Sequence, residues 1–137
     1  MARELMKSPK YWKPWFFENS RIPIWLSYIS PITINAITLG PLVFSRNEMD
    51  QRVRQHETIH LQQYLELGFI GFWFVYLWDY LQGLHKYGDG KLAYYNIRFE
   101  KEAYRYDEEQ DYLEKRRRYC WVKMNEDKNG YDKINRV

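Results

Sequence analysis

The order of apolar and polar residues predicts a short extended region followed by helices. Across residues 31–40, apolar and small polar residues alternate and many of the apolar ones are β-branched, which is typical of a strand. Gly40 and Pro41 interrupt this alternation, and residues 42–44 form a second short apolar run. Together the two runs predict a β-hairpin or a small edge sheet.

A helix of roughly 20 residues is predicted next, because no helix breaker occurs between Asn47 and Leu67. Asn47 can cap its start, and Glu48 and Asp50 suit the positive end of the helix dipole. One stripe of side chains recurs at helical spacing and predicts the face that meets the rest of the molecule. Its members are Val53, His56, Ile59, His60, Gln63, Tyr64 and Leu67.

Two further helical regions are predicted. Gly68 and Gly71 mark a break or a tight corner, and residues 69–84 are apolar nearly all round, which indicates a largely buried helix. After a glycine-rich turn at 87–90, a third helical region is predicted from about 92 to 124. We therefore expect an α+β fold, mostly α, with three main helices and a short β-hairpin or edge strand before the first of them.

The 137 residues suit one domain, 1–137, with a modest core. Residues 1–30 predict an irregular, aromatic N-terminal arm, in which Pro9 and Pro14 oppose a long helix. We expect this arm to cover hydrophobic surface; its alternative role is a lid or rim of a cleft. Residues 125–137 are polar and predict a frayed C-terminal tail.

Composition narrows the choice of partners and compartment. The formal net charge of +3 is mild, and the basic run at 115–118 is flanked by acidic residues, so we expect no nucleic-acid partner. The single cysteine, Cys120, excludes an internal disulfide and a cysteine-based zinc site. Residues 1–10 lack the apolar run of a secretory signal. A cytoplasmic, reducing location is therefore expected.

Two apolar stretches resemble membrane spans, but we expect neither to cross a bilayer. Residues 22–44 contain three prolines, which oppose a continuous helix. Residues 67–78 extend for only about 12 residues, whereas a spanning helix needs about 20. Peripheral membrane contact through residues 67–78 and the basic run stays open as an alternative.

The motif His-Glu-x-x-His occurs at residues 56–60, near the middle of the first predicted helix. Side chains four residues apart lie on one helix face, so the imidazoles of His56 and His60 can reach one metal ion. Glu57 lies roughly 100° round the axis, where it can address a water molecule at that metal. Zinc uses nitrogen ligands, an open position for water and a nearby base, so the motif predicts a zinc site that needs a third ligand.

Several positions are candidates for that ligand. Residue 66 is glutamate rather than the histidine of the metzincin pattern, and His85, beside a glycine-rich turn, suits a surface or capping role. Residues 99–104 read Phe-Glu-Lys-Glu-Ala-Tyr, which offers Glu100 and Glu102. Two residues apart on a helix, these two side chains point about 200° from each other, so only one can face the metal.

From about residue 37 to residue 107, the chain resembles small, single-domain gluzincin metallopeptidases, in which a glutamate from a later helix completes His-Glu-x-x-His. The resemblance includes the preceding strand, the glutamines at 62 and 63, and the stretch at 99–104. It implies a minimal zincin-like fold with His56 and His60 as metal ligands and Glu57 as the general base. It also implies Glu100 as the third ligand, with Glu102 as the alternative.

One position departs from the gluzincin pattern. Many gluzincins have an aspartate four residues after the ligand glutamate, where it orients the first histidine, but this chain has Tyr104. A metal-ligating histidine normally donates its other N–H to a carboxylate or carbonyl. Asp107 or a backbone carbonyl is therefore expected to take that role.

The function that follows is zinc-dependent hydrolysis of peptide bonds in a peptide or protein substrate, with one Zn²⁺ per chain. Glu57 takes a proton from the metal-activated water and returns it to the leaving amine. Tyr64, Tyr95 and Tyr104 are candidates to stabilise the oxyanion. The alternatives are a non-catalytic, zinc-stabilised binding or assembly protein and a peripheral membrane-associated protein.

Overall fold

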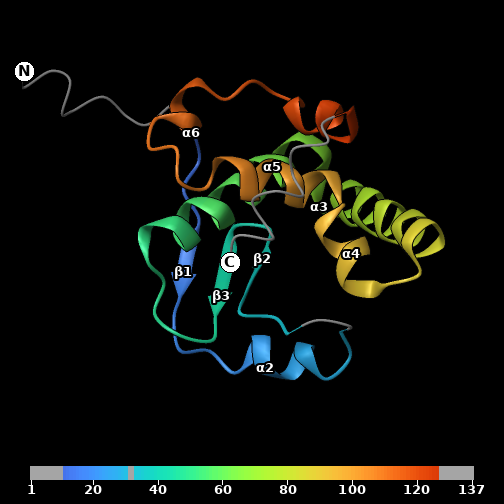
Figure 1. Ribbon diagram of the computed structural model, residues 1–137. Helices are drawn as coiled ribbons and strands as arrows, with labels where there is room; N and C mark the ends of the chain where they lie inside the picture. Colours follow the sequence, from blue (N-terminus) through green and yellow to red (C-terminus); the bar gives the residue numbers. More distant parts are fainter. Residues whose placement is uncertain (1–10, 31–32, 127–137) are drawn as a thin grey trace, which may run out of the picture.

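The computed structural model describes residues 11–30 and 33–126, and it has the α+β, mostly helical fold that the sequence predicts (Figure 1). The outer part of the predicted arm, residues 1–10, and the tail from 127 onward lie outside the described residues. The elements in chain order are β1 (Trp15–Phe17), α2 (Ile22–Ser27), β2 (Ala36–Leu39), β3 (Leu42–Ser45), α3 (Gln51–Tyr87), α4 (Gly90–Tyr95), α5 (Arg98–Tyr106), α6 (Tyr112–Lys115) and the 3₁₀ helix η1 (Cys120–Glu126).

The three strands form one small sheet in the order β1-β3-β2. β2 and β3 make the predicted antiparallel hairpin, and Gly40 turns the chain between them with a φ of 61°. β1 belongs to the predicted irregular arm, yet it pairs in parallel with β3. The predicted strand at 31–40 is shortened because the Ile34 N–H donates to Ser27 Oγ at 2.9 Å, which ties residue 34 to α2. β2 pairs with β3 on one side only, so it is an edge strand of the sheet that the described residues form.

The motif helix and the apolar helix after it are two halves of α3, which bends at Gly68. Gly68 has φ 72° and ψ 171°, a backbone region that is open almost only to glycine. The helix begins slightly later than predicted. Asp50, not Asn47, is its N-cap, because the Asp50 carboxylate accepts the Val53 N–H at 2.9 Å.

The second half of α3 carries one acidic residue, Asp79, in an otherwise apolar run. The Arg98 guanidinium donates to both of its carboxylate oxygens, at 2.8 and 2.9 Å, so Asp79 joins α3 to the start of α5. Across the part of the chain that the structure describes, no helix has the length and apolar character needed to cross a membrane.

The helical region predicted over 92–124 is divided into α4, α5, α6 and η1. Asn96 ends α4, because its side-chain amide donates to the Leu92 carbonyl at 2.7 Å and closes the last turn. α5 ends at Asp107, whose carboxylate turns toward Arg52 of α3, 3.3 Å away. Local polar contacts of this kind cannot be read from helical periodicity alone.

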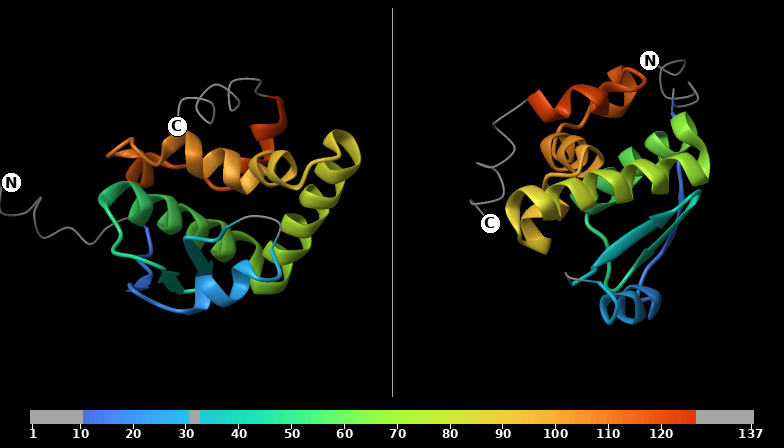
Figure 2. Two further views of the ribbon diagram at one scale, coloured as in Figure 1. Left: turned by 60° about the horizontal axis from the view of Figure 1, so that its bottom comes forward. Right: turned by 90° about the vertical axis from the view of Figure 1, so that its right-hand side faces the viewer.

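The first half of α3 lies between the sheet and α5, so it is covered on both sides (Figure 2). Three aromatic rings stack through the core beside it. Tyr64 and Phe72 have ring centroids 3.8 Å apart, and Phe72 and Phe99 have centroids 4.5 Å apart. The stack fixes α5 against both halves of α3, and aromatic contacts of this kind add to the hydrophobic stabilisation.

Replacing Gly68 with alanine is expected to lower the free energy of unfolding by about 1–3 kcal/mol, since a Cβ disfavours this backbone conformation. A Cβ built at this position meets open space, so the cost comes from the backbone alone. Urea denaturation measures the change, with Gln82→Ala on the exposed face of α3 as the control. Equal stability of the two variants would show that the bend tolerates a side chain.

Candidate metal centre

The first half of α3 buries the whole motif between the sheet and α5. His56, Glu57 and His60 are each at most 7 % exposed, and Glu100 of α5 is 4 % exposed. Polar side chains this deeply buried are expected to have partners. Their partners are one another and a small set of nearby groups.

Three ligand-type atoms converge at one point. His56 Nε2 lies 3.2 Å from His60 Nε2 and 3.3 Å from Glu100 Oε2, and His60 Nε2 lies 3.4 Å from the same oxygen. In a tetrahedral zinc site with bonds of about 2.0–2.1 Å, ligand atoms are about 3.3–3.4 Å apart. The triangle therefore has the size of one face of a zinc tetrahedron, and its donor types suit zinc.

The outer nitrogen of each imidazole faces an acceptor. His60 Nδ1 lies 2.8 Å from Gln63 Oε1, and His56 Nδ1 lies 3.6 Å from Asp107 Oδ2. An amide oxygen only accepts, so His60 donates from Nδ1, and Nε2 of the neutral imidazole then has the lone pair that a metal requires. Contacts of this kind orient histidine ligands in metal sites.

The amide of Gln63 is itself fixed in orientation. Its NH₂ group donates to the Phe99 carbonyl and to Glu102 Oε1, both at 3.1 Å, so its oxygen has to face His60. Arg116 binds Glu102 through both carboxylate oxygens, at 2.7 and 3.0 Å. A buried polar chain thus runs from Arg116 to the imidazole of His60.

These contacts separate the two glutamates that the sequence left as alternatives. Glu102 is fully buried and is bound by Arg116, Gln63 and Tyr112, on the side of α5 away from the histidines. Glu100 Oε1 accepts from the Tyr76 hydroxyl at 2.9 Å, which leaves Oε2 toward the imidazoles. The structure therefore brings Glu100, and not Glu102, to His56 and His60.

Glu57 lies beside the cluster and is held by the hairpin. Its Oε2 accepts from the Thr38 hydroxyl of β2 at 2.6 Å. Glu57, both histidines and Glu100 line the same cleft. A carboxylate that is oriented by a neutral hydroxyl keeps its second oxygen for another partner in that cleft.

The cleft has a volume of about 1130 Å³ and opens between β2, α3, α4 and α5. Aromatic side chains from the second half of α3 and from α4 form much of its lining, among them Trp73, Tyr80 and Tyr95. Leu26 and Ile29, at and just after α2, line it too, so part of the predicted arm forms one rim. A site of this size accommodates an extended segment of a substrate.

The other predicted site residues lie at different distances from the cluster. The Tyr104 ring contacts the His56 ring, with centroids 4.5 Å apart, and Tyr104 lines the cleft. Tyr64 is in the core and donates its hydroxyl to the Thr38 carbonyl at 2.8 Å, so it does not line the cleft. His85 is exposed near the end of α3 and takes no part in the cluster.

Electrostatics favour positive charge at the point where the ligand atoms meet. Burial lowers the pKa of His56, but hydrogen bonds to Asp107 and Glu100 outweigh it and raise that pKa to about 10. Burial raises the pKa of Glu100, but the His60 charge and a hydrogen bond from His56 hold it well below its usual range. A proton or a metal cation can supply the positive charge that these carboxylates favour.

Sequence reasoning gave three residues of the site no role in it. Tyr76 lies in the helix that was predicted over residues 69–84, and it binds Glu100. Thr38 lies in the predicted alternating strand, and it binds Glu57. No pattern in the sequence marks either contact, because both join distant elements. Gln63 is different, since its place three residues after His60 on the same helix stripe is a usable signal.

Comparisons with known proteins identify no relative of this chain. No protein-family model, no curated protein and no solved structure matches the chain. Function is therefore inferred from the geometry of the site.

Arg116→Met is expected to lower the free energy of unfolding by about 3–5 kcal/mol, since it leaves the Glu102 charge buried without its partner. Arg116 has a side chain that is only 5 % exposed and also binds Glu66. Urea denaturation measures the loss. Arg117→Met, at an exposed neighbour, is the control, and a loss no larger than that of the control would contradict the role given to Arg116.

Proposed function

We propose that this chain hydrolyses peptide bonds at one zinc ion held by His56, His60 and Glu100. The observation that supports this most strongly is the triangle of two imidazole nitrogens and one carboxylate oxygen, with sides of 3.2–3.4 Å. All three groups line the cleft, so a zinc ion held by them would be reached by water and substrate from there, as catalytic zinc sites require. Zinc in such a site polarises a carbonyl and lowers the pKa of water.

Glu57 is the proposed general base. It lines the cleft beside the three ligands, and the Thr38 hydroxyl holds one of its oxygens. The other oxygen accepts the proton of the attacking water and then donates it to the amine that leaves. Thr38 thereby restricts the carboxylate to one orientation, which lowers the entropic cost of the proton transfer.

An extended peptide is the proposed substrate, aligned along β2. Ala36, Ile37 and Thr38 of this edge strand line the cleft, so main-chain groups on the free side of β2 can pair with a substrate strand. Pairing of this kind recognises the backbone of the substrate and tolerates many different side chains. A peptide paired with β2 would lie next to Glu57, because the Thr38 hydroxyl binds that carboxylate.

Tyr104 is the proposed stabiliser of the oxyanion. Its ring lies against His56 and it lines the cleft. Burial, followed by the negative charge of Glu100, raises the pKa of its hydroxyl, so the group stays protonated and can donate a hydrogen bond.

The resemblance to gluzincin metallopeptidases is part of this proposal. Its later glutamate corresponds to Glu100, which lies at the histidines. The orienting aspartate of that pattern is replaced by Tyr104, and Asp107, 3.6 Å from His56 Nδ1, is proposed in its place. A reducing, cytoplasmic compartment is the proposed location, in keeping with a chain whose one cysteine, Cys120, can form no internal disulfide.

The metal-free chain is expected to take up one zinc ion per molecule, and Glu100→Gln and His56→Ala are each expected to lower the zinc affinity at least tenfold. Loss of one ligand from a three-ligand set removes much of the binding free energy. Competition with a chromophoric chelator measures affinity, and circular dichroism checks folding. His85→Ala, an exposed histidine, is the control. Unchanged affinity in Glu100→Gln would remove Glu100 from the ligand set.

Glu57→Gln is expected to lower peptidase activity about 10²–10⁴-fold, the usual contribution of a general base, while zinc content is retained. The measurement is cleavage of an unfolded protein by the zinc-loaded chain, followed by mass spectrometry. Glu48→Gln, outside the described cleft lining, is the control. Full zinc binding with no cleavage by the wild-type chain would favour the non-catalytic, zinc-stabilised alternative.

A further inference from the structure

Between Phe69 and Leu81, the exposed face of α3 has no polar side chain. From residue 69 to residue 81, every exposed side chain is large and apolar. These side chains are Phe69, Ile70, Phe74, Leu77, Trp78 and Leu81, with Ile70 84 % and Phe74 71 % exposed. Isolated apolar residues on a surface need no explanation, but a continuous helix face of them indicates a binding surface.

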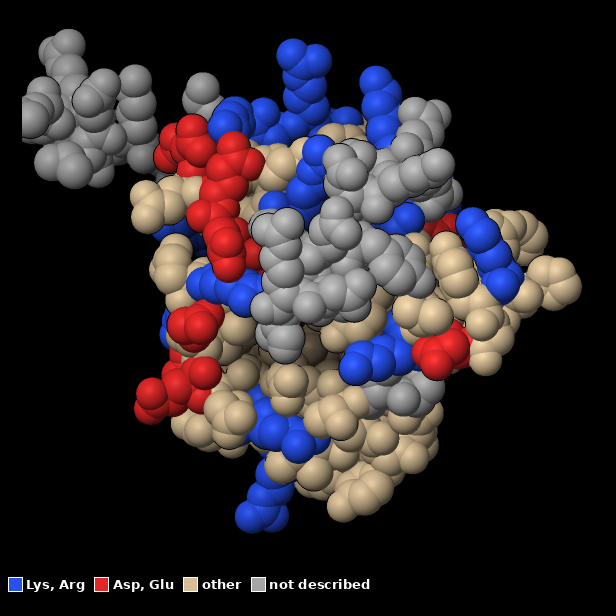
Figure 3. Space-filling view, viewed as in Figure 1, with Lys and Arg blue, Asp and Glu red and all other residues tan. Residues whose placement is uncertain are grey.

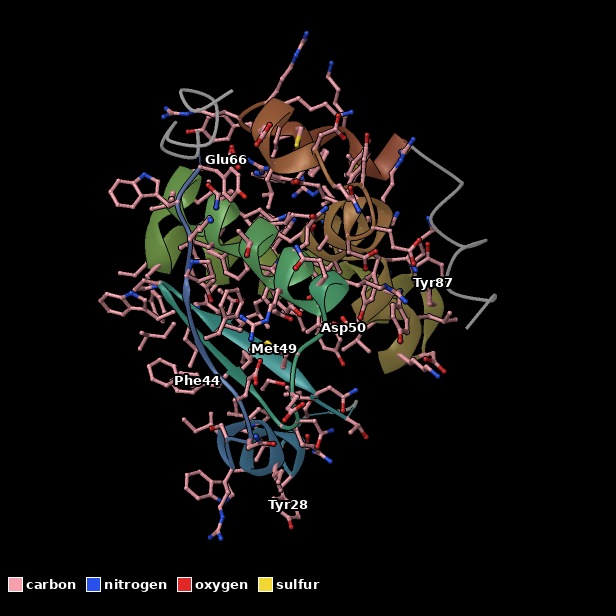
Figure 4. The ribbon with its side chains drawn as sticks, turned by 90° about the vertical axis from the view of Figure 1, so that its left-hand side faces the viewer. Tyr28, Phe44, Met49, Asp50, Glu66 and Tyr87 are labelled. Carbon is pink, nitrogen blue, oxygen red and sulfur yellow. The ribbon has the colours of Figure 1, made fainter. Side chains whose placement is uncertain are left out.

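A second apolar patch lies on and just after α2. Trp25 is 62 % exposed, Tyr28 is 83 % exposed and Ile29 is 84 % exposed. Tyr28, labelled in Figure 4, points away from the body of the molecule at its lower end. Tryptophan and tyrosine combine an apolar ring with a polar tip, which suits the boundary between water and lipid.

The two patches meet at the mouth of the cleft. Ile29 on one side and Leu77 on the other are exposed and also line the cleft. The left view of Figure 2 shows α2 along the lower edge of the molecule and the second half of α3 rising at its right. A flat partner that covers both patches would therefore face the cleft opening.

Basic side chains lie beside both patches, and one exposed acidic residue, Asp89 at the start of α4, lies three residues after Lys86. No acidic residue occurs between Glu18 and Glu48, whereas Arg21 and Arg46 lie in that stretch. In the second half of α3 the sole acidic residue, Asp79, is buried against Arg98, and Lys86 is exposed near the helix end. Figure 3 shows blue atoms and no red ones around α2 at the bottom of the molecule.

We propose that these two patches form one surface that docks on an anionic lipid bilayer. The apolar side chains enter the headgroup region, and Arg21 and Lys86 contact lipid phosphates. A second copy of the chain fits less well, because a symmetric contact across α2 would bring Arg21 and Arg46 of both copies together, with no acidic residue between Glu18 and Glu48 to pair with them. This inference goes beyond peptide hydrolysis and stands independently of it.

Sedimentation with vesicles tests the proposal on the full chain. The chain is expected to bind vesicles of phosphatidylcholine and phosphatidylserine more tightly than vesicles of phosphatidylcholine alone. Phe74→Glu and Trp25→Glu are each expected to lower that binding about tenfold or more. Each variant replaces apolar area that would enter the bilayer with a charge. Arg21→Glu is expected to lower binding only to the vesicles that contain phosphatidylserine.

Two matched controls and one further measurement keep the proposal falsifiable. Val122→Glu replaces an exposed apolar residue of η1, at the opposite end of the molecule from α2 (Figure 1), and Arg117→Glu replaces an exposed arginine outside both patches. Both variants are expected to bind vesicles like the wild type. Sedimentation equilibrium measures the oligomeric state of every variant. Absence of vesicle binding by the wild type, equal losses in the controls, or a dimer that Phe74→Glu separates would overturn the proposal.

Discussion

The packing of α5 against the first half of α3 determines whether the cluster exists at all. His56 and His60 come from one helix, whereas Glu100 comes from α5 and lies 44 residues after His56 in the sequence. The stack of Tyr64, Phe72 and Phe99 fixes the two helices together. Hydrophobic stacking thus sets the distances among polar atoms. A shift of α5 by even a fraction of a turn would turn Glu100 away from the imidazoles.

Burial of so many charged groups has a desolvation cost, which ion pairs offset in this structure. Arg116 holds Glu102, Arg98 holds Asp79, and Arg52 approaches Asp107. Each pair also joins two elements, so the charges fix geometry while they offset the cost of desolvation. The cluster at His56 and His60 differs, because carboxylates outnumber the fixed cations there, and a bound cation is what the surplus of negative charge favours.

The sequence indicated the fold class, the bend at Gly68 and the two histidines because local patterns encode them: alternation, glycine placement and i,i+4 spacing. It left Glu100 and Glu102 as alternatives, since the choice depends on which face of α5 meets α3. Contacts such as Thr38 to Glu57 and Tyr76 to Glu100 join elements with no shared periodicity, so one sequence carries no signal for them. The breaks at Asn96 and Asp107 were missed because polar side chains, rather than glycine or proline, end those helices.

The contribution of Gln63 has a consequence for the order of events during folding. α3 on its own presents His56 and His60, but Gln63 takes its orientation from Phe99 and Glu102, which belong to α5. Docking of α5 against α3 therefore brings Glu100 to the site and also fixes the tautomer of His60. Uptake of an ion would then report that α5 has docked against α3, rather than that α3 has formed. In a chain arrested before this docking, the imidazoles of His56 and His60 would have no fixed orientation.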